Sequence, residues 1–188
     1  MRLACLAAVA VLALAAGAAP AQEKVENPEF VSWSKFKKGT TTTLKMTSTT
    51  AGVVTESTIT TTLVEVGADK IVVEAAGVTA FNGMEFKAPP TSREVKKTIE
   101  LPKGVKSDGP QGQKPKGAYE DGNETLKVGG MEIKTKWYKI KTEINGSTTD
   151  SKVWMSDDVP GNTVKMEGTT IGKVVTTIKM ELIEFKKP

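Results

Sequence analysis

The chain has 188 residues and a formal net charge of +4, from 26 basic and 22 acidic residues that interleave along the sequence. It contains no histidine and one cysteine, Cys5. Once Cys5 is removed with a signal peptide, this composition excludes Ser-His-Asp and Cys-His catalysis and metal centres with histidine or cysteine ligands. The small, interleaved charge argues against a nucleic-acid partner.

Met1–Ala21 has the pattern of a secretory signal peptide. Arg2 supplies the positive start, and Leu3–Ala16 is an apolar run too short to cross a bilayer as a helix. Ala19-Pro20-Ala21 is a small-x-small site, so we expect cleavage before Gln22; cleavage after Ala18 is the alternative. The mature protein is therefore predicted to be exported, to the periplasm or the extracellular space.

The mature chain, Gln22–Pro188, is predicted to form one domain without lipid anchor, disulfide or membrane span. Cys5 is not expected to carry a lipid, because only four residues precede it and the apolar run follows it. No second apolar stretch of about 18 residues occurs in the sequence. A domain of this length buries enough surface to fold without disulfides or metals.

The segment Val25–Lys38 is the predicted helix. Asn27 suits the N-cap, Pro28 suits the first helical position, and Gly39 suits the C-cap. Three aromatic residues spaced three apart share one face of this helix: Phe30, Trp33 and Phe36. Such an aromatic stripe usually packs into a core, so the helix is expected to plug the open side of a curved sheet.

The rest of the chain predicts antiparallel strands, because its 25 threonines all follow Gly39 and β-branched residues favour strands. Turn signals separate the expected strands. These are Thr40–Thr49, Val53–Val66, Lys70–Ala76, Val78–Lys87, Arg93–Leu101, Glu124–Val128, Met131–Ile144, Ser147–Met155, Asn162–Glu167 and Lys173–Phe185. The long segment 102–122, rich in Pro, Gly and Lys, is expected to be a solvated loop; the alternative is contact with an anionic partner.

Two strands change the face on which their apolar residues lie. In Met131–Ile144 the change falls between Trp137 and Tyr138, and in Lys173–Phe185 it falls at Ile183. A β-bulge produces such a change and bends the sheet. The sequence therefore predicts a mostly β fold, a strongly curved antiparallel sheet or incomplete barrel with one short N-terminal helix. A β-sandwich is the alternative.

Short segments in the first part of the mature chain are also similar in sequence to segments near its C-terminus. Thr43-Leu44-Lys45-Met46 is repeated as Thr163-Val164-Lys165-Met166, and Leu63-Val64-Glu65 is repeated as Leu182-Ile183-Glu184. Either an internal duplication or shared hairpin chemistry explains this similarity.

Three segments resemble a group of exported bacterial proteins of unknown function: Asn27–Met46, Thr62–Glu74 and Lys152–Met166. The last segment contains the Trp-x-Ser-x-x-Val-Pro-Gly pattern of the group, from Trp154 to Gly161. The resemblance covers most of the mature chain and implies no activity and no site residues. The expected helix, curved hairpins and Pro-Gly turn are also loosely similar to lipoprotein-carrier half-barrels of the bacterial envelope.

The sequence favours an exported, non-enzymatic binding protein that holds an apolar or amphipathic ligand, or a segment of another cell-envelope protein, in a curved sheet. A structural or adhesive cell-envelope protein and a hydrolase working through paired carboxylates are the alternatives. No cofactor is predicted. No metal is predicted either, since Asp157-Asp158 lacks the spacing of a calcium loop. The predicted ligand-binding residues are aromatic: Phe30, Trp33, Phe36, Trp137, Tyr138 and Trp154. The oligomeric state is not predicted.

Overall fold

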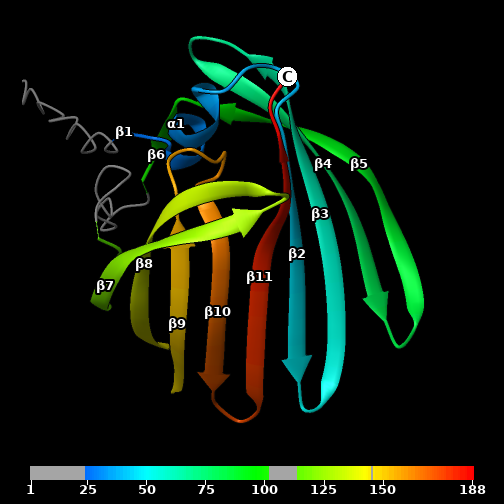
Figure 1. The fold of residues 1–188 in the computed structure, drawn as a ribbon, viewed down its shortest axis with the longest axis vertical. Helices are drawn as coiled ribbons and strands as arrows, with labels where there is room; N and C mark the ends of the chain where they lie inside the picture. Colours follow the sequence, from blue (N-terminus) through cyan, green and yellow to red (C-terminus); the bar gives the residue numbers. More distant parts are fainter. Residues whose placement is uncertain (1–23, 102–113, 145) are drawn as a thin grey trace, which may run out of the picture.

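The computed structural model of the protein describes residues 24–101, 114–144 and 146–188, and these form one large antiparallel sheet and one short helix (Figure 1). The elements are β1 (Lys24–Glu26), α1 (Pro28–Ser34), β2 (Thr41–Thr50), β3 (Val53–Val66), β4 (Lys70–Phe81), β5 (Met84–Lys96), β6 (Thr98–Glu100), β7 (Ala118–Val128), β8 (Met131–Ile144), β9 (Ser147–Met155), β10 (Thr163–Ile171) and β11 (Val175–Lys186). The predicted signal peptide lies outside the described residues.

The nine long strands are hydrogen-bonded in the order β5-β4-β3-β2-β11-β10-β9-β8-β7. The first and last strands of this order are not paired with each other, so the sheet is curved but does not close into a barrel. The remaining strands, β1 and β6, form a separate antiparallel pair. The predicted fold class is confirmed, and the β-sandwich alternative is wrong because all nine long strands belong to one sheet.

The helix is shorter than predicted. Its N-cap is Asn27, as expected, and the Asn27 side chain accepts a 3.0 Å hydrogen bond from the backbone N–H of Glu29. Residues before it pair with β6 instead of joining the helix. The C-cap is Lys35 rather than Gly39, whose N–H donates to the Leu63 carbonyl at 2.8 Å.

One face of the sheet carries the helix and the main core. Phe30 and Trp33 of α1 pack with four buried sheet residues: Leu63, Ile71, Val73 and Val95. Cross-strand pairing aligns Leu63 with Val73 and Ile71 with Val95, and directly opposed residues point to the same side. We call this side the helix-bearing face.

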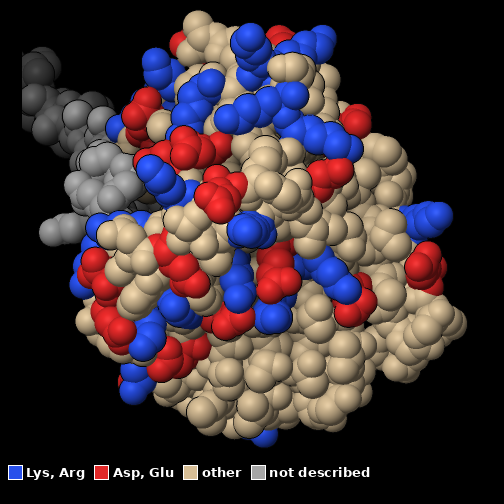
Figure 2. Space-filling model, in the orientation of Figure 1, with Lys and Arg blue, Asp and Glu red and all other residues tan. Residues whose placement is uncertain are grey.

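The opposite side is the charged face. Lys165 lies 2.9 Å from Glu167 within β10, and Lys179 of β11 lies 3.4 Å from Glu181. Lys45 of β2 lies 3.2 Å from Glu56 of β3. Figure 2 shows alternating blue and red side chains at mid-height over β10, β11 and β2.

The β7–β8 hairpin crosses in front of β9 and β10 and reaches β11 (Figure 1). Near its tip, the backbone at Gly129 approaches the Ile183 carbonyl. A second core cluster forms where the hairpin meets β10 and β11 and contains Val128, Ile133, Val159, Val164, Leu182 and Phe185. Phe36, just after α1, packs against both core clusters, so the two are continuous.

One predicted bulge is confirmed and the other is wrong. The register shifts at Leu182/Glu184 in β11, where the apolar pattern changes face. In β8 the pairing with β9 runs without a shift from Lys136 to Ile144. The face change between Trp137 and Tyr138 therefore needs no bulge: the two side chains point to opposite faces, where Trp137 pairs with Trp154 and Tyr138 pairs with Val153.

Two strand boundaries also differ from the prediction. The chain from Lys70 to Lys96 forms two strands joined at Asn82-Gly83, both in the left-handed region with φ of 49° and 77°. Such a pair suits the two-residue hairpin turn. The expected loop over 102–122 ends earlier, since β7 begins at Ala118; residues 102–113 lie outside the described residues, as does Asn145 of the expected Asn145-Gly146 turn.

Candidate functional site

The helix covers only one end of the helix-bearing face. Beyond it, three cross-strand rows continue from β4 or β2 to β8, and we call these rows the open face. The methionine row contains Thr79, Ser57, Met46, Met180, Met166, Val153 and Tyr138. The isoleucine row contains Phe81, Thr55, Ser48, Ile178, Gly168, Ser151 and Ile140. The threonine row contains Thr50, Thr176, Thr170, Thr149 and Thr142.

None of the residues in these three rows is charged. Aliphatic and sulfur-containing side chains occupy the centre, where Met46, Met180 and Met166 lie on three adjacent strands and are each half-buried. Nearby, Ile59 of β3 is 41% exposed on the same face. This arrangement leaves an uncharged surface in partial contact with solvent, in which aliphatic, methionine and aromatic side chains are interspersed with serines and threonines.

Hydroxyl groups line the end of the open face that lies farthest from the helix. Thr50 Oγ1 and Thr176 Oγ1 lie 3.1 Å apart, and Thr149 Oγ1 and Thr170 Oγ1 lie 2.9 Å apart, both as hydrogen bonds across strands. Each pair uses one of its two O–H donors, so this end of the open face keeps hydroxyl groups that can bind water or a ligand. Going away from the helix, the helix-bearing face therefore carries first the aromatic core, then the methionines, and finally the paired threonines.

At the helix end, Arg93 carries a charge on the helix-bearing face. Arg93 Nη1 donates a 2.8 Å hydrogen bond to Glu29 of α1, and the hydrogen bond to this carboxylate raises the pKa of Arg93. The pair ties the helix to β5 and neutralises the cation beside the open face.

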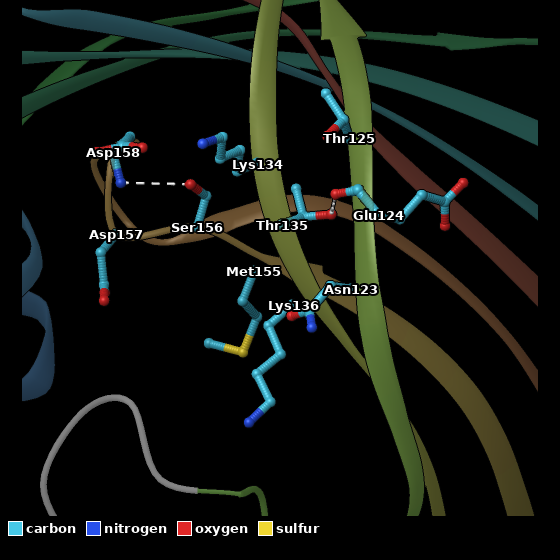
Figure 3. A pocket seen from close by; sticks show the side chains of 10 residues that line it. All are labelled: Asn123, Glu124, Thr125, Lys134, Thr135, Lys136, Met155, Ser156, Asp157 and Asp158. Carbon is cyan, nitrogen blue, oxygen red and sulfur yellow. Dashed lines mark hydrogen bonds between the residues drawn. The ribbon is translucent and has the colours of Figure 1, made fainter.

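A polar cleft of about 550 Å³ adjoins the open face where β8 leaves β9 (Figure 3). Pairing between these strands begins at Lys136 and Met155, so the earlier part of β8 separates from β9 and the cleft opens between it and the β9–β10 turn. Its lining residues are Asn123, Glu124, Thr125, Lys134, Thr135, Lys136, Met155, Ser156, Asp157 and Asp158. Met155 belongs to both surfaces, because it lies two residues beyond Val153 on the same side of β9.

Most of the charged groups in the cleft already have partners. Glu124 accepts a 2.7 Å hydrogen bond from Trp154 Nε1, Lys136 lies 4.0 Å from Asp121, and Asp157 lies 3.7 Å from Lys35. Among the described residues, the side-chain charges of Lys134 and Asp158 have no ion pair. Figure 3 shows the Lys134 amine directed toward the turn that carries Ser156 and Asp158.

The structure divides the six aromatic residues predicted to bind a ligand between the two faces. Phe30 and Trp33 of α1 are buried between the helix and the sheet, and Phe36 packs edge-to-face on Phe185 with ring centroids 6.0 Å apart. Tyr138 is buried at the end of the methionine row. Trp137 and Trp154 lie on the charged face, where Lys152 Nζ sits 4.2 and 4.4 Å from their ring centroids.

The residues that sequence reasoning missed are the methionines and the cleft residues. Alternation along β2 places Met46 beside Leu44 on one face, but the alignment of Met46 with Met180 and Met166 depends on pairing between distant strands. Lys134 carries no local signal at all. Its significance comes only from the folding of the hairpin opposite the β9–β10 turn.

The described parts of the chain hold no group of three or more His, Cys, Asp or Glu side chains arranged to bind a metal ion. Within the same residues, no helix has the length and hydropathy needed to cross a bilayer.

No family model matches the chain, and no curated protein matches it. A solved structure from Parabacteroides distasonis, described as a "putative lipoprotein", is similar to this chain with a TM-score of 0.41 and 14% sequence identity. The match covers 80% of this chain and 96% of that one. A likeness of this strength supports no inference about function.

Proposed function

We propose that this protein is an exported, non-enzymatic binding protein that holds an apolar or amphipathic ligand on the open face. The observation that carries the proposal is the segregation of charge between the two faces of one sheet. Charged side chains alternate along the charged face, whereas the three rows of the open face contain none. Export is supported by the signal-peptide pattern of Met1–Ala21.

Charged side chains cost nothing to desolvate on a sheet face that always stays in water, so their absence from the open face needs another explanation. Desolvating a charged group costs far more than desolvating an aliphatic one, so a surface that binds an apolar molecule excludes ionic groups. Large exposed apolar patches on soluble proteins commonly mark such binding sites. Methionine suits this purpose, because its unbranched thioether adapts to ligands of different shape.

The polar groups near the open face support binding rather than catalysis. Glu124 is engaged by Trp154, and Asp157 pairs with Lys35. A glycosidase-type mechanism needs two carboxylates facing each other across a substrate. Of the three acids that line the cleft, Glu124 and Asp157 instead have partners on different elements, and Asp158 has no ion pair among the described residues.

The proposal is tested with adjacent residues of β11 that point to opposite faces. Ile178→Glu places a carboxylate in the centre of the open face, and Thr177→Glu places the same carboxylate on the charged face. Binding is measured by titrating each purified protein with a fluorescent fatty acid. Lipids that co-purify with the unmodified protein are identified by extraction and mass spectrometry.

We expect Ile178→Glu to weaken binding of the fatty acid at least tenfold, and Thr177→Glu to change it less than twofold. Absence of binding by the unmodified protein, with no co-purified lipid, would overturn the proposal. Equal loss in both variants would overturn the assignment to the open face. A concentration-dependent dimer that Ile178→Glu dissociates would show instead that a second copy covers this face. Binding to isolated cell-wall material without lipid binding would favour a structural or adhesive role.

A further inference from the structure

The cleft at the end of the methionine row supplies what an apolar face lacks, a place for the polar end of an amphiphile. It adjoins the open face through Met155, and the path from Met155 continues over Val153, Met166, Met180 and Met46. A chain lying along this path would bring its head group to the cleft.

The charges of the cleft indicate which head group fits. Lys134 on β8 and Asp158 on the β9–β10 turn are the lining ionic residues without an ion pair among the described residues. They have opposite signs and come from the two walls of the cleft. A purely anionic group would satisfy Lys134 but lie near Asp157 and Asp158, and an uncharged group would satisfy neither charge.

We infer that the cleft receives the zwitterionic head group of a phospholipid, with the phosphate at Lys134 and the ammonium at Asp158, while the acyl chain lies on the methionine row. This inference rests on the proposed function, because it assigns the polar end of the same ligand. The hydroxyl of Thr125 and the amide of Asn123 also line the cleft and offer further hydrogen bonds to the head group.

The test compares three lipids with the same acyl chain: a monoacylglycerol, lysophosphatidic acid and lysophosphatidylethanolamine. Each is titrated into the full-length protein below its micellar concentration, by displacement of a fluorescent fatty acid. We expect lysophosphatidylethanolamine to bind about three- to tenfold more tightly than the monoacylglycerol, the scale of one or two partly exposed charge pairs. Lysophosphatidic acid should also bind more tightly than the monoacylglycerol, but by a smaller factor than lysophosphatidylethanolamine does.

Lys134→Gln and Asp158→Asn should each reduce this preference, and the double variant should bind lysophosphatidylethanolamine and the monoacylglycerol equally. The matched control is Lys127→Gln with Glu132→Gln, a cross-strand pair on the same hairpin that does not line the cleft. That control should leave the preference unchanged.

The outcomes separate the two proposals. Equal binding of all three lipids to the unmodified protein would overturn the head-group assignment and leave the apolar-ligand function standing. Tightest binding of lysophosphatidic acid, or a preference that survives in the double variant, would also overturn the assignment. Failure of every lipid to bind would instead remove the proposed function.

Discussion

Trp154 of β9 donates a 2.7 Å hydrogen bond from Nε1 to the Glu124 carboxylate of β7, although β8 separates these strands in the sheet. Glu124 pairs with Thr135, two residues before Trp137, and Trp137 pairs with Trp154, so the Glu124 and Trp154 side chains lie on the same side of these three strands. Lys152 reinforces the contact by lying 4.4 Å from the Trp154 ring centroid and 3.9 Å from Glu124. The β7–β8 hairpin supplies one wall of the polar cleft, so this contact helps to position Lys134.

Removal of the acceptor tests the importance of this contact. Glu124→Ala leaves the indole N–H of the buried Trp154 without its partner, which costs about 1–3 kcal/mol of unfolding free energy. Glu124→Gln keeps an acceptor and should recover part of the loss. Urea denaturation followed by tryptophan fluorescence measures both. Glu132→Ala, an exposed residue of the same hairpin, is the control and should change stability by less than about 0.5 kcal/mol; equal effects of the two alanine variants would contradict the assigned role.

Gly122 of β7 tests the packing of Trp137 on the same hairpin. A Cβ atom at Gly122 would lie 2.6 Å from the Trp137 ring, so the ring must move when alanine is introduced. We expect Gly122→Ala to destabilise the fold by about 1–3 kcal/mol through overpacking and to shift the tryptophan emission spectrum. Gly77→Ala is the matched control, because a Cβ there meets its nearest atom at 3.7 Å. An unchanged stability and spectrum for Gly122→Ala would show that Trp137 is free to rearrange.

Leu63 and Ile59 test whether the helix-bearing face is packed at one end and open at the other. The two side chains lie on the same face of β3, four residues apart, yet Leu63 is 0% exposed and Ile59 is 41% exposed. Leu63→Ala should cost about 2–5 kcal/mol because it leaves a cavity in the core beneath the helix. Ile59→Ala should cost markedly less in the same denaturation experiment. A similar loss for both would mean that the open face is covered and would count against the proposed binding surface.

The sequence predicted the features that depend on neighbouring residues. Asn27 and Pro28 define the start of the helix, and Ala51-Gly52 and Gly129-Gly130 fall in turns between paired strands. The sequence similarity between the chain ends has a structural counterpart, since Leu63/Glu65 and Leu182/Glu184 both carry register shifts. The two repeated segments therefore share a register shift as well as a sequence pattern.

The features that sequence reasoning missed depend on contacts between distant strands. The pairing of β2 with β11 aligns Met46 with Met180 and could not be inferred from either strand alone. The aromatic residues gave a stronger local signal, but the structure buries Phe30 and Trp33 in the core and covers Trp154 on the charged face. Large aromatic side chains mark where the sheet is packed, whereas the candidate binding surface consists of smaller and more flexible side chains.

An exposed ion pair links the edge strand β5 to β4, and its contribution to stability depends on pH. Lys70 Nζ of β4 donates a 2.5 Å hydrogen bond to Glu94 of β5, which lowers the pKa of Glu94 and raises the pKa of Lys70. Because the carboxyl pKa is lowered, the stability that the ion pair contributes through Glu94 is fully present above the pKa that Glu94 has in the unfolded chain. It is lost as pH falls through the lower pKa that Glu94 has in the folded protein. The raised amine pKa means that the contribution is present below the pKa of Lys70 in the unfolded chain and is lost as pH rises through its higher folded value.

A double-mutant cycle of Lys70→Met and Glu94→Gln therefore should show a coupling free energy at neutral pH that disappears at both extremes. The coupling should also weaken in high salt, because both side chains are exposed and solvent ions screen them. Hydrogen exchange of β5 backbone amides gives a second measure, since an edge strand opens more readily when its pairing with β4 weakens. A coupling that persists unchanged at a pH where Glu94 is protonated would show that the two side chains stabilise β5 by packing rather than by charge.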